Sequence, residues 1–365
     1  WDKFPLLSRP ISIHDIDENS ISFLYKVVGE GTKIFSTLKV GDDIKLEGPY
    51  GKGYEKVEGK VALVGGGIGV APLYLVAKNI ENKNYTAVSS YTHAVVFEKS
   101  PVIVGERINP TGKPKLKEAL RENALDYILS EAVAQQENGA KILDVNVGLP
   151  EIDEVAMLKT AVCELQAIIN LPLQIDTASA TAMEAALRRY NGKAMINSVN
   201  GKESSMREIF PLVKKYGGVV VALTLDENGI PTTWEGRVEI AKKILATAAE
   251  YGIDKKDIIF DTLAMTISAD SSAAKATLKA LEYIRYELGC HTSLGVSNVS
   301  FGLPNRDAVN STFFACAMER GLSAAIMNPF SAGMMKTYYT YNALHDFDKN
   351  CSKYIDYITT HEEVA

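Results

Sequence analysis

The sequence predicts an α/β protein whose main part is a (β/α)8 TIM barrel, and two observations carry that prediction. From residue 101 onward the chain contains eight short apolar runs of strand character, and stretches with the periodicity of amphipathic helices separate them. The runs recur about every 32 residues, the length of one strand-helix unit. Eight such units without an obvious reversal favour a closed barrel over an open, doubly wound sheet.

The eight expected strands are rich in Val, Ile, Leu and Met. They are PVIVGERIN (101–109), KILDVNVG (141–148), PLQIDT (172–177), AMINSVN (194–200), VVVALTLD (219–226), IIFDTL (258–263), TSLGVSNVS (292–300) and SAAIMNP (323–329). Residues 202–217 and 236–252 are clear examples of the amphipathic helices expected between them. We therefore expect a barrel over residues 101–350 and a C-terminal tail over 351–365.

Residues 1–80 have a different character. Residues 20–29 and 42–51 alternate apolar and polar positions and end in glycine-containing turns, which predicts short antiparallel strands. Residues 60–80 combine an apolar strand, a glycine cluster and an apolar helix, which predicts one β-turn-α unit. We expect a small, incomplete antiparallel β domain over 1–80, joined by a linker over 81–100.

Composition narrows the class of function. The net charge is −6 over 365 residues without a dense basic block, which argues against a nucleic-acid partner. No apolar run is long enough to span a bilayer and the first residues do not resemble a signal peptide, so a cytoplasmic location is expected. The four cysteines are widely scattered, which disfavours a disulfide framework, a zinc site or an iron–sulfur cluster.

Acids and amides stand at the carboxyl end of every expected strand, where TIM barrels carry their catalytic groups. They are Glu106, Asn109, Asp144, Asn146, Asp176, Asn197, Asn200, Asp226, Asp261, Asn298 and Asn328. Asp and Asn are also ordinary turn and N-cap residues, which explains any one of them, but their presence at all eight ends points to a site. No strand ends in lysine, and no histidine accompanies the carboxylates, so Schiff-base chemistry and a catalytic zinc ion are disfavoured and no metal is expected.

A ring of carboxylates and carboxamides suits a flat heterocycle with hydrogen-bond donors and acceptors along its edge. A carboxylate accepts two parallel N–H bonds, whereas an asparagine offers one donor and one acceptor. Pterins carry a matching amino-oxo-pyrimidine edge. On these grounds alone, a purine or another heterocycle fits as well.

Six ordered motifs resemble the pterin-binding methyltransferases, a family that includes the methyltetrahydrofolate domain of cobalamin-dependent methionine synthase. The motifs are GERINPTG (105–112), LDVNVGLPEID (143–153), PLQIDT, MINSVNG (195–201), LTLDENGIP (223–231) and GVSNVSFGLPNR (295–306). The resemblance extends from about residue 86 to the end. It implies that Asp176, Asn197 and Asp261 hydrogen-bond the pterin ring, that Glu106 and Arg306 line the same pocket, and that Asn298 approaches the methyl-bearing nitrogen.

The resemblance also implies a reaction, the transfer of a methyl group from 5-methyltetrahydrofolate to the reduced cobalt of a cobalamin. The homocysteine barrel and the cobalamin-binding loop of methionine synthase have no counterpart in this sequence, so the cobalamin must come from another domain or protein. A homodimer is expected from the family. The enzyme alternative is a dihydropteroate synthase-like reaction, which needs a diphosphate site with more basic residues than Arg306 alone.

The N-terminal segment resembles a fragment of the flavin reductase family, in particular the electron-transfer subunit of dihydroorotate dehydrogenase. RPISI (9–13) is similar to a flavin-binding motif and GEGT (29–32) to a second one, which implies FAD contacts from Arg9, Ser12, Gly31 and Thr32. Several strands of that family and its cysteine-rich segment are absent. We therefore expect a structural remnant or a fusion rather than a working flavin site, and the alternative is an electron-transfer module with a passenger barrel.

Overall fold

The computed structural model describes residues 13–16, 20–23, 25, 27, 30–42, 85–98 and 100–361. The chain divides into two compact units, residues 1–84 and residues 85–365. In the described part of the first unit, β1 (Ile13–Ile16) pairs antiparallel with β2 (Ile21–Phe23), and helix α1 (Glu30–Phe35) follows. The β-turn-α unit expected over 60–80 lies outside the described residues.

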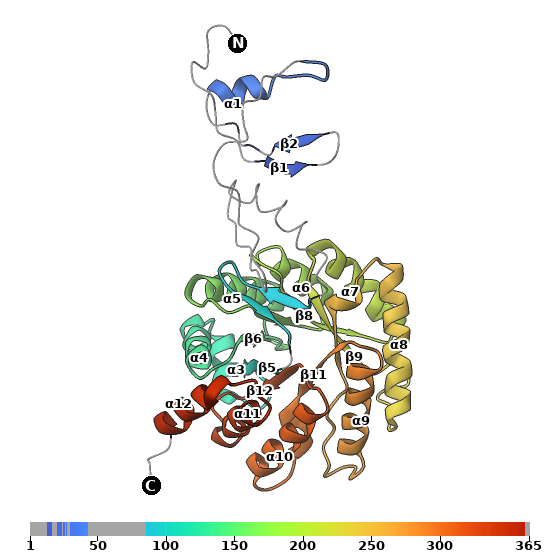
Figure 1. Cartoon of the computed structure of the whole chain (residues 1–365). Coiled ribbons are helices and arrows are strands. Elements are labelled where there is room, and N and C mark those ends of the chain that lie inside the picture. Colours follow the sequence, from blue (N-terminus) through green and yellow to red (C-terminus); the bar gives the residue numbers. More distant parts are fainter. Residues whose placement is uncertain are drawn as a thin grey trace. The chain divides into compact units, whose positions relative to one another are not determined.

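The second unit contains a closed barrel of eight parallel strands, which confirms the predicted fold (Figure 1). Its strands are β5 (Val102–Ile108), β6 (Ile142–Val145), β7 (Leu173–Asp176), β8 (Met195–Asn200), β9 (Val219–Leu223), β10 (Ile258–Asp261), β11 (His291–Gly295) and β12 (Ala324–Met327). The neighbours run in sequence order, and β12 pairs with β5 to close the ring. All eight strands begin within the runs that the sequence predicts or one residue before them.

Helices surround the barrel and connect its strands (Figure 1). They are α3 (Pro114–Arg121), α4 (Leu125–Glu137), α5 (Glu154–Ile168), α6 (Ala180–Leu187), α7 (Glu203–Tyr216), α8 (Trp234–Glu250), α9 (Ala273–Tyr286), α10 (Arg306–Glu319), α11 (Ala332–Leu344) and α12 (Ser352–His361), with short 3-10 turns η2 (Lys255–Asp257), η3 (Val296–Ser300) and η4 (Lys349–Cys351). Helix α12 occupies most of the expected tail. Within the described residues, no helix has the length and apolar character needed to cross a bilayer.

Local sequence fixes where several of these helices begin. The side chains of Asp153, Ser179, Thr233 and Ser331 each accept a hydrogen bond from a main-chain N–H in the first turn of the helix that follows. Such caps satisfy N–H groups that have no partner inside the helix. Because each of these helices follows a strand, the caps fix the length of the loops at the carboxyl end of the barrel.

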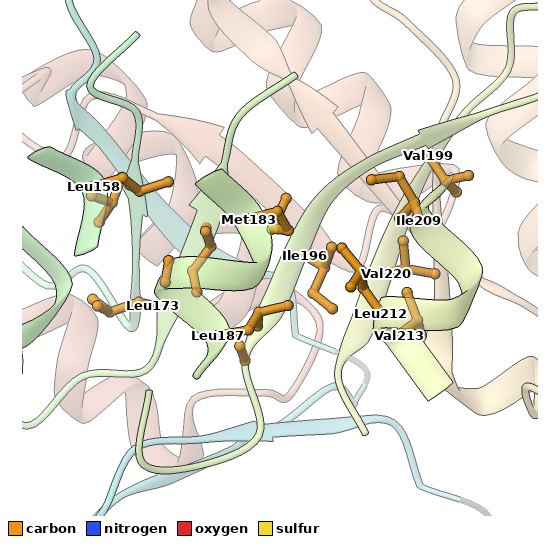
Figure 2. Close-up of a cluster of buried hydrophobic side chains, with 14 of the residues drawn as sticks. Leu158, Leu173, Met183, Leu187, Ile196, Val199, Ile209, Leu212, Val213 and Val220 are labelled. Atoms are coloured by element: carbon orange, nitrogen blue, oxygen red, sulfur yellow. The ribbon is translucent and has the colours of Figure 1, made fainter. Parts of the chain in front are cut away.

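The alternation of side chains along each strand separates two cores. Outward side chains such as Leu173, Ile196 and Val220 pack with Met183 of α6 and Ile209 of α7 in the layer between strands and helices (Figure 2). The inward set forms a separate cluster at the floor of the barrel, made of Val102, Val104, Ile142, Met195, Val219, Val221, Ile259 and Ala324. Inward positions above this apolar floor face the carboxyl ends of the strands.

A hairpin belongs to the floor of the barrel. Strands β3 (Ala87–Ser89) and β4 (Ala94–Val96) pair antiparallel within the segment expected as a linker. Val88, Val95 and Phe97 are buried in the floor cluster. The Ser89 N–H donates to the Lys193 carbonyl at 2.9 Å and the Thr86 hydroxyl to the Lys256 carbonyl at 2.6 Å, so the hairpin is hydrogen-bonded to the loops that precede β8 and β10.

Candidate functional site

The predicted strand-end residues converge on the carboxyl end of the barrel. Inward positions of alternate strands share a layer in this fold. The pairing register places Asp144 of β6, Asn197 of β8 and Asp261 of β10 in one such layer, together with Ile326 of β12. The layer above it contains Glu106 of β5, Asp176 of β7 and Gly295 of β11.

Asp144 and Asp176 form an acidic pair on neighbouring strands. Gln174 Nε2 donates to Asp144 Oδ1 at 2.6 Å, and Asn146 Nδ2 donates to Asp176 Oδ2 at 3.0 Å. Burial raises the pKa of Asp144 well above its usual value, and the nearby Asp176 charge raises it further. Burial also raises the pKa of Asp176 to about 6, against the opposing effect of the Asn146 hydrogen bond. The pair can therefore hold a proton near neutral pH.

Asp261 is the third aspartate of the site, and main-chain N–H groups hold it in place. The Leu263 N–H donates to Asp261 Oδ1 at 2.7 Å, and the Gly295 N–H also donates to this carboxyl. Burial raises its pKa to about 6 even though these hydrogen bonds and Arg237 lower it. Arg237 itself donates to the carbonyls of Thr262 and Leu263, which fixes the loop that follows β10.

Asn298 lies on the 3-10 turn η3, which corrects the prediction of a continuous strand over 292–300. Strand β11 ends at Gly295, and the chain turns so that Val296 and Val299, three residues apart, are both buried. The Asn298 side chain is exposed to solvent and stands over Gly295. A Cβ atom on Gly295 would lie 2.9 Å from Asn298 Nδ2, so glycine at this position leaves room for the amide.

Glu106 completes the ring from strand β5. Its carboxylate accepts a hydrogen bond from the Ser297 hydroxyl at 3.2 Å, which connects β5 to the turn that carries Asn298. Burial raises its pKa, and the positive charge of Lys113 opposes that shift. The Lys113 ammonium donates to the carbonyls of Glu106 and Asn109, each at 3.1 Å. The site thus contains a cation within the loop that follows β5.

Arg306 contacts the turn η3 from the first position of helix α10. Its Nε donates to the Ser300 hydroxyl and its Nη2 to the Ser297 carbonyl, both at 2.9 Å. The guanidinium also lies 5.1 Å from the centre of the exposed Phe301 ring. Arg306 therefore supports the segment that carries Asn298, and a direct contact with a ligand stays a prediction.

Six of the strand-end residues have a turn role. The side-chain oxygens of Asn109, Asn200, Asp226 and Asn328 each accept a hydrogen bond from the main-chain N–H two residues later. This is the ordinary Asx turn. Asn146 and Asp261 accept in the same way from the Gly148 and Leu263 N–H groups. Ligand contacts of Asn109 and Asn200 remain predictions.

Three neighbours of the site were missed at the sequence level: Lys113, Gln174 and Ser297. Gln174 lies two residues before Asp176, so strand alternation puts both on the inner face, and that spacing was an available signal. Ser297 adjoins Asn298. Lys113 follows the GERINPTG motif, and nothing in its spacing distinguishes it from the surface lysines beside it.

One further feature, a surface hollow, lies apart from this ring. A hollow of about 400 Å³ lies beside the β9–α8 loop, where Asp226, Ile230 and Lys243 are among its lining residues. Asp144, Asp176 and Asp261 are not among its lining residues. We therefore place the candidate site at the ring of acids and amides and not at this hollow. Among the described residues, no three His, Cys, Asp or Glu side chains form a group that could hold a metal ion.

Comparison with known proteins shows the family to which the barrel belongs. A family model described as pterin binding enzyme matches residues 105–328, which include all eight barrel strand ends. The chain belongs to the pterin-binding enzyme family. A methylcorrinoid:tetrahydrofolate methyltransferase from Eubacterium limosum is 32% identical over 259 residues, which cover 69% of this chain and 94% of that protein. This relationship supports a methyltransferase-type member of the family.

Other relatives match only part of their own length. The methionine synthase of Mycobacterium tuberculosis is 32% identical over 293 residues, which are 73% of this chain but 25% of that protein. The chain therefore spans about a quarter of this longer relative. Among solved structures, a dihydropteroate synthase from Xanthomonas albilineans superimposes with a TM-score of 0.56 at 17% identity, covering 71% of this chain and 98% of that one, which shows the shared fold.

A segment of the chain is similar to a protein of another class. The electron transfer subunit of dihydroorotate dehydrogenase B from Clostridium acetobutylicum is 59% identical over 86 residues, or 23% of this chain and 35% of that subunit. Of the residues expected to contact FAD, Arg9 and Ser12 lie outside the described residues, whereas Gly31 and Thr32 belong to helix α1. FAD binding by this segment stays a prediction.

Proposed function

We propose that this pterin-binding barrel takes 5-methyltetrahydrofolate and transfers its methyl group to the reduced cobalt of a cobalamin, leaving tetrahydrofolate. The observation that carries the proposal is the position of Asn298. Its amide stands over Gly295, whose N–H donates to the buried Asp261 carboxyl, so an exposed amide adjoins the acidic ring at the open end of the barrel. The identity to a methylcorrinoid:tetrahydrofolate methyltransferase over nearly the whole of that relative supports the same reaction.

The ring supplies the groups that a pterin edge requires. Asp176, Asn197 and Asp261 would bind the amino-oxo-pyrimidine edge, because carboxylates accept its N–H donors and an asparagine serves a donor and an acceptor together. Glu106 and the Asp144–Asn146 strand end would line the remaining sides. Asp144 and Asp261 are buried and Asp176 is half-buried, so these hydrogen bonds are largely shielded from water, which strengthens them.

The chemistry requires a proton at the methylated nitrogen. A neutral tertiary amine is a poor leaving group, because cleavage of its carbon–nitrogen bond would generate a strongly basic amide anion. Protonation allows the cobalt electron pair to take the methyl carbon while the nitrogen keeps the bonding pair and its proton. Asn298 would stabilise the protonated nitrogen through its carbonyl oxygen. Acids with a pKa near 6, such as Asp176 and Asp261, can exchange that proton at neutral pH.

The methyl acceptor must come from outside the barrel, so the proposed partner is a corrinoid bound to another protein or domain, or free cobalamin. A homodimer and a cytoplasmic location belong to the same proposal. The dihydropteroate synthase-like alternative uses a diphosphate substrate. The cations described at the site, Lys113 and Arg306, already donate to main-chain carbonyls, which favours methyl transfer over diphosphate binding.

The first test mixes the full chain with 5-methyltetrahydrofolate and chemically reduced cobalamin under anaerobic conditions and follows methylcobalamin by its visible spectrum. We expect methylcobalamin to form. Asn298→Ala should slow its formation by about 100-fold, the usual cost of removing one preorganised hydrogen-bonding group from a transition state. Asn170→Ala is the matched control, because Asn170 accepts hydrogen bonds from the β3–β4 turn near the floor of the barrel.

Other outcomes would contradict the proposal in different ways. Binding of 5-methyltetrahydrofolate without methylcobalamin would leave a pterin site and remove this reaction. Formation of dihydropteroate from 4-aminobenzoate and a dihydropterin diphosphate would establish the alternative enzyme. Absence of any folate binding would contradict the proposal that the substrate is a folate.

A further inference from the structure

Gln174 is an unusual residue in the interior of the barrel. It is fully buried on strand β7, one layer below the acidic ring. Its Nε2 donates to Asp144 Oδ1 at 2.6 Å, whereas its Oε1 is buried without a hydrogen-bond partner. Leaving a buried carbonyl oxygen unpaired is costly, and such groups in folded proteins call for an explanation.

The surroundings of Gln174 do not fix which way its amide faces. Its layer is completed by Val104, Val221 and Ser293, two apolar side chains and a hydroxyl that is itself buried without a partner. The amide therefore has one fixed contact, with Asp144. Exchanging its nitrogen and oxygen would break no other hydrogen bond of this side chain.

We propose that Gln174 is a positioning residue that serves Asp144 in both of its protonation states. When Asp144 is a carboxylate, Nε2 donates to it. When Asp144 carries a proton, the amide turns over and Oε1 accepts from the acid. The separation of 2.6 Å lies within the usual range of O–H···O bonds and just below that of N–H···O bonds, so the spacing already accommodates the turned-over amide. The inference rests on the proposed function to the extent that it places Asp144 in the pterin pocket.

The groups around Asp144 explain why both its charged and its protonated form matter. Asp176 from β7 and Glu106 from β5 disfavour its charge, and burial acts in the same direction. Opposing them are the hydrogen bonds from Gln174 and from Asn197 of β8, and the positive charge of Lys113 in the loop after β5. A pterin that brings N–H donors into this pocket favours the carboxylate, so the proton must leave as the ligand enters. Because the Gln174 amide can turn over, Asp144 can lose or gain its proton without moving.

The test is a carboxyl-13C NMR titration of the full chain labelled in aspartate, with Asp144→Asn used to assign the signal. Gln174→Met keeps the side-chain length and removes the hydrogen bond. We expect it to raise the midpoint of Asp144 by about one pH unit, because the charge-assisted bond from Nε2 to the carboxylate is stronger than the bond that the neutral acid makes to Oε1. Ser293→Ala, which removes the unpaired hydroxyl of the same layer, should leave the midpoint unchanged.

A second variant guards against a substitution that fails to fold. Gln174→Asn keeps an amide but is one methylene shorter, so it should raise the midpoint in the same direction. An unchanged Asp144 midpoint in both Gln174 variants, or an equal shift in Ser293→Ala, overturns the inference. The titration uses the ligand-free protein, so a failure to bind 5-methyltetrahydrofolate would defeat the proposed function and leave this result independent. If the ligand binds, its pH profile should move with the Asp144 midpoint.

Discussion

At the scale of single residues, Gly295 offers a clean test of how Asn298 is placed. Its backbone has φ −73° and ψ 85°, which a residue with a side chain can adopt, so the amide of Asn298 at 2.9 Å is the obstacle to a larger residue. We predict that Gly295→Ala folds with nearly unchanged stability but loses methyl transfer about as strongly as Asn298→Ala. Methylcobalamin formation and a thermal melt measure the two effects.

The double variant provides the control. If Gly295→Ala acts by displacing the amide, it should cost little more activity when combined with Asn298→Ala, because the two changes act on one group. Fully additive losses would mean that Gly295 acts in another way, for example through its hydrogen bond to Asp261.

Residue types at the ends of strands predicted three acids of the candidate site, because within the apolar strands the acids stand at the inward positions above the floor. Asp144, Asp176 and Asp261 follow from that pattern. Sequence could not separate them from Asn109 or Asn200, since a turn asparagine and a ligand-binding asparagine occupy the same place. The role of Gln174 depends on a contact across two strands, which no local pattern reveals.

At the scale of elements, the apolar runs predicted all eight strands, because burial on both faces requires continuous hydrophobic residues. The error over 292–300 has a physical cause. Val296 and Val299 fit the buried face of a helical turn, but valine is also typical of strands, so the sequence pattern predicts that the strand continues. The position of Asn298 depends on that turn.

The β3–β4 hairpin is an element whose contribution can be measured. Phe97 is 3% exposed and lies in the floor cluster, with its ring 5.8 Å from that of His291. We predict that Phe97→Ala lowers the free energy of unfolding by about 3 kcal/mol, the usual cost of removing a buried aromatic side chain. Urea denaturation measures the change. Methyl transfer below the unfolding transition should be retained, because the floor is remote from Asn298.

A surface substitution on the same hairpin separates burial from general effects of mutation. Tyr91 is exposed in the turn between the two strands, so Tyr91→Ala should change stability by about 0.5 kcal/mol or less. Equal losses of unfolding free energy in Phe97→Ala and Tyr91→Ala would argue that the hairpin does not seal the floor through Phe97.

At the scale of the whole molecule, the buried acids tie stability to pH. Burial raises the pKa of Asp261 from 3.8 to about 6, so the folded protein binds this proton more tightly than the unfolded chain does. The resulting stabilisation is complete below the unfolded value and is lost as the pH rises through the folded one. Each pKa unit corresponds to about 1.4 kcal/mol, so roughly 3 kcal/mol is at stake between pH 4 and pH 7.

Asp261→Asn removes this dependence without changing the size of the side chain. Its oxygen can still accept from the Leu263 N–H. We predict that the variant gains stability relative to the parent at pH 7 but much less at pH 4, as measured by urea denaturation at both values. A gain of the same size at both pH values would mean that Asp261 does not carry its raised pKa in the folded state.

The closed floor of the barrel has a consequence for kinetics. Because the β3–β4 hairpin and the apolar layer above it block one end, the folate and the bulky corrinoid of the proposed reaction would have to use the same entrance. The folate lies deeper in the proposed complex, so it must arrive before the corrinoid docks and cannot depart until the corrinoid has left. Such an enzyme would follow a compulsory order, folate first on and last off, and an excess of corrinoid would slow it by trapping the empty barrel.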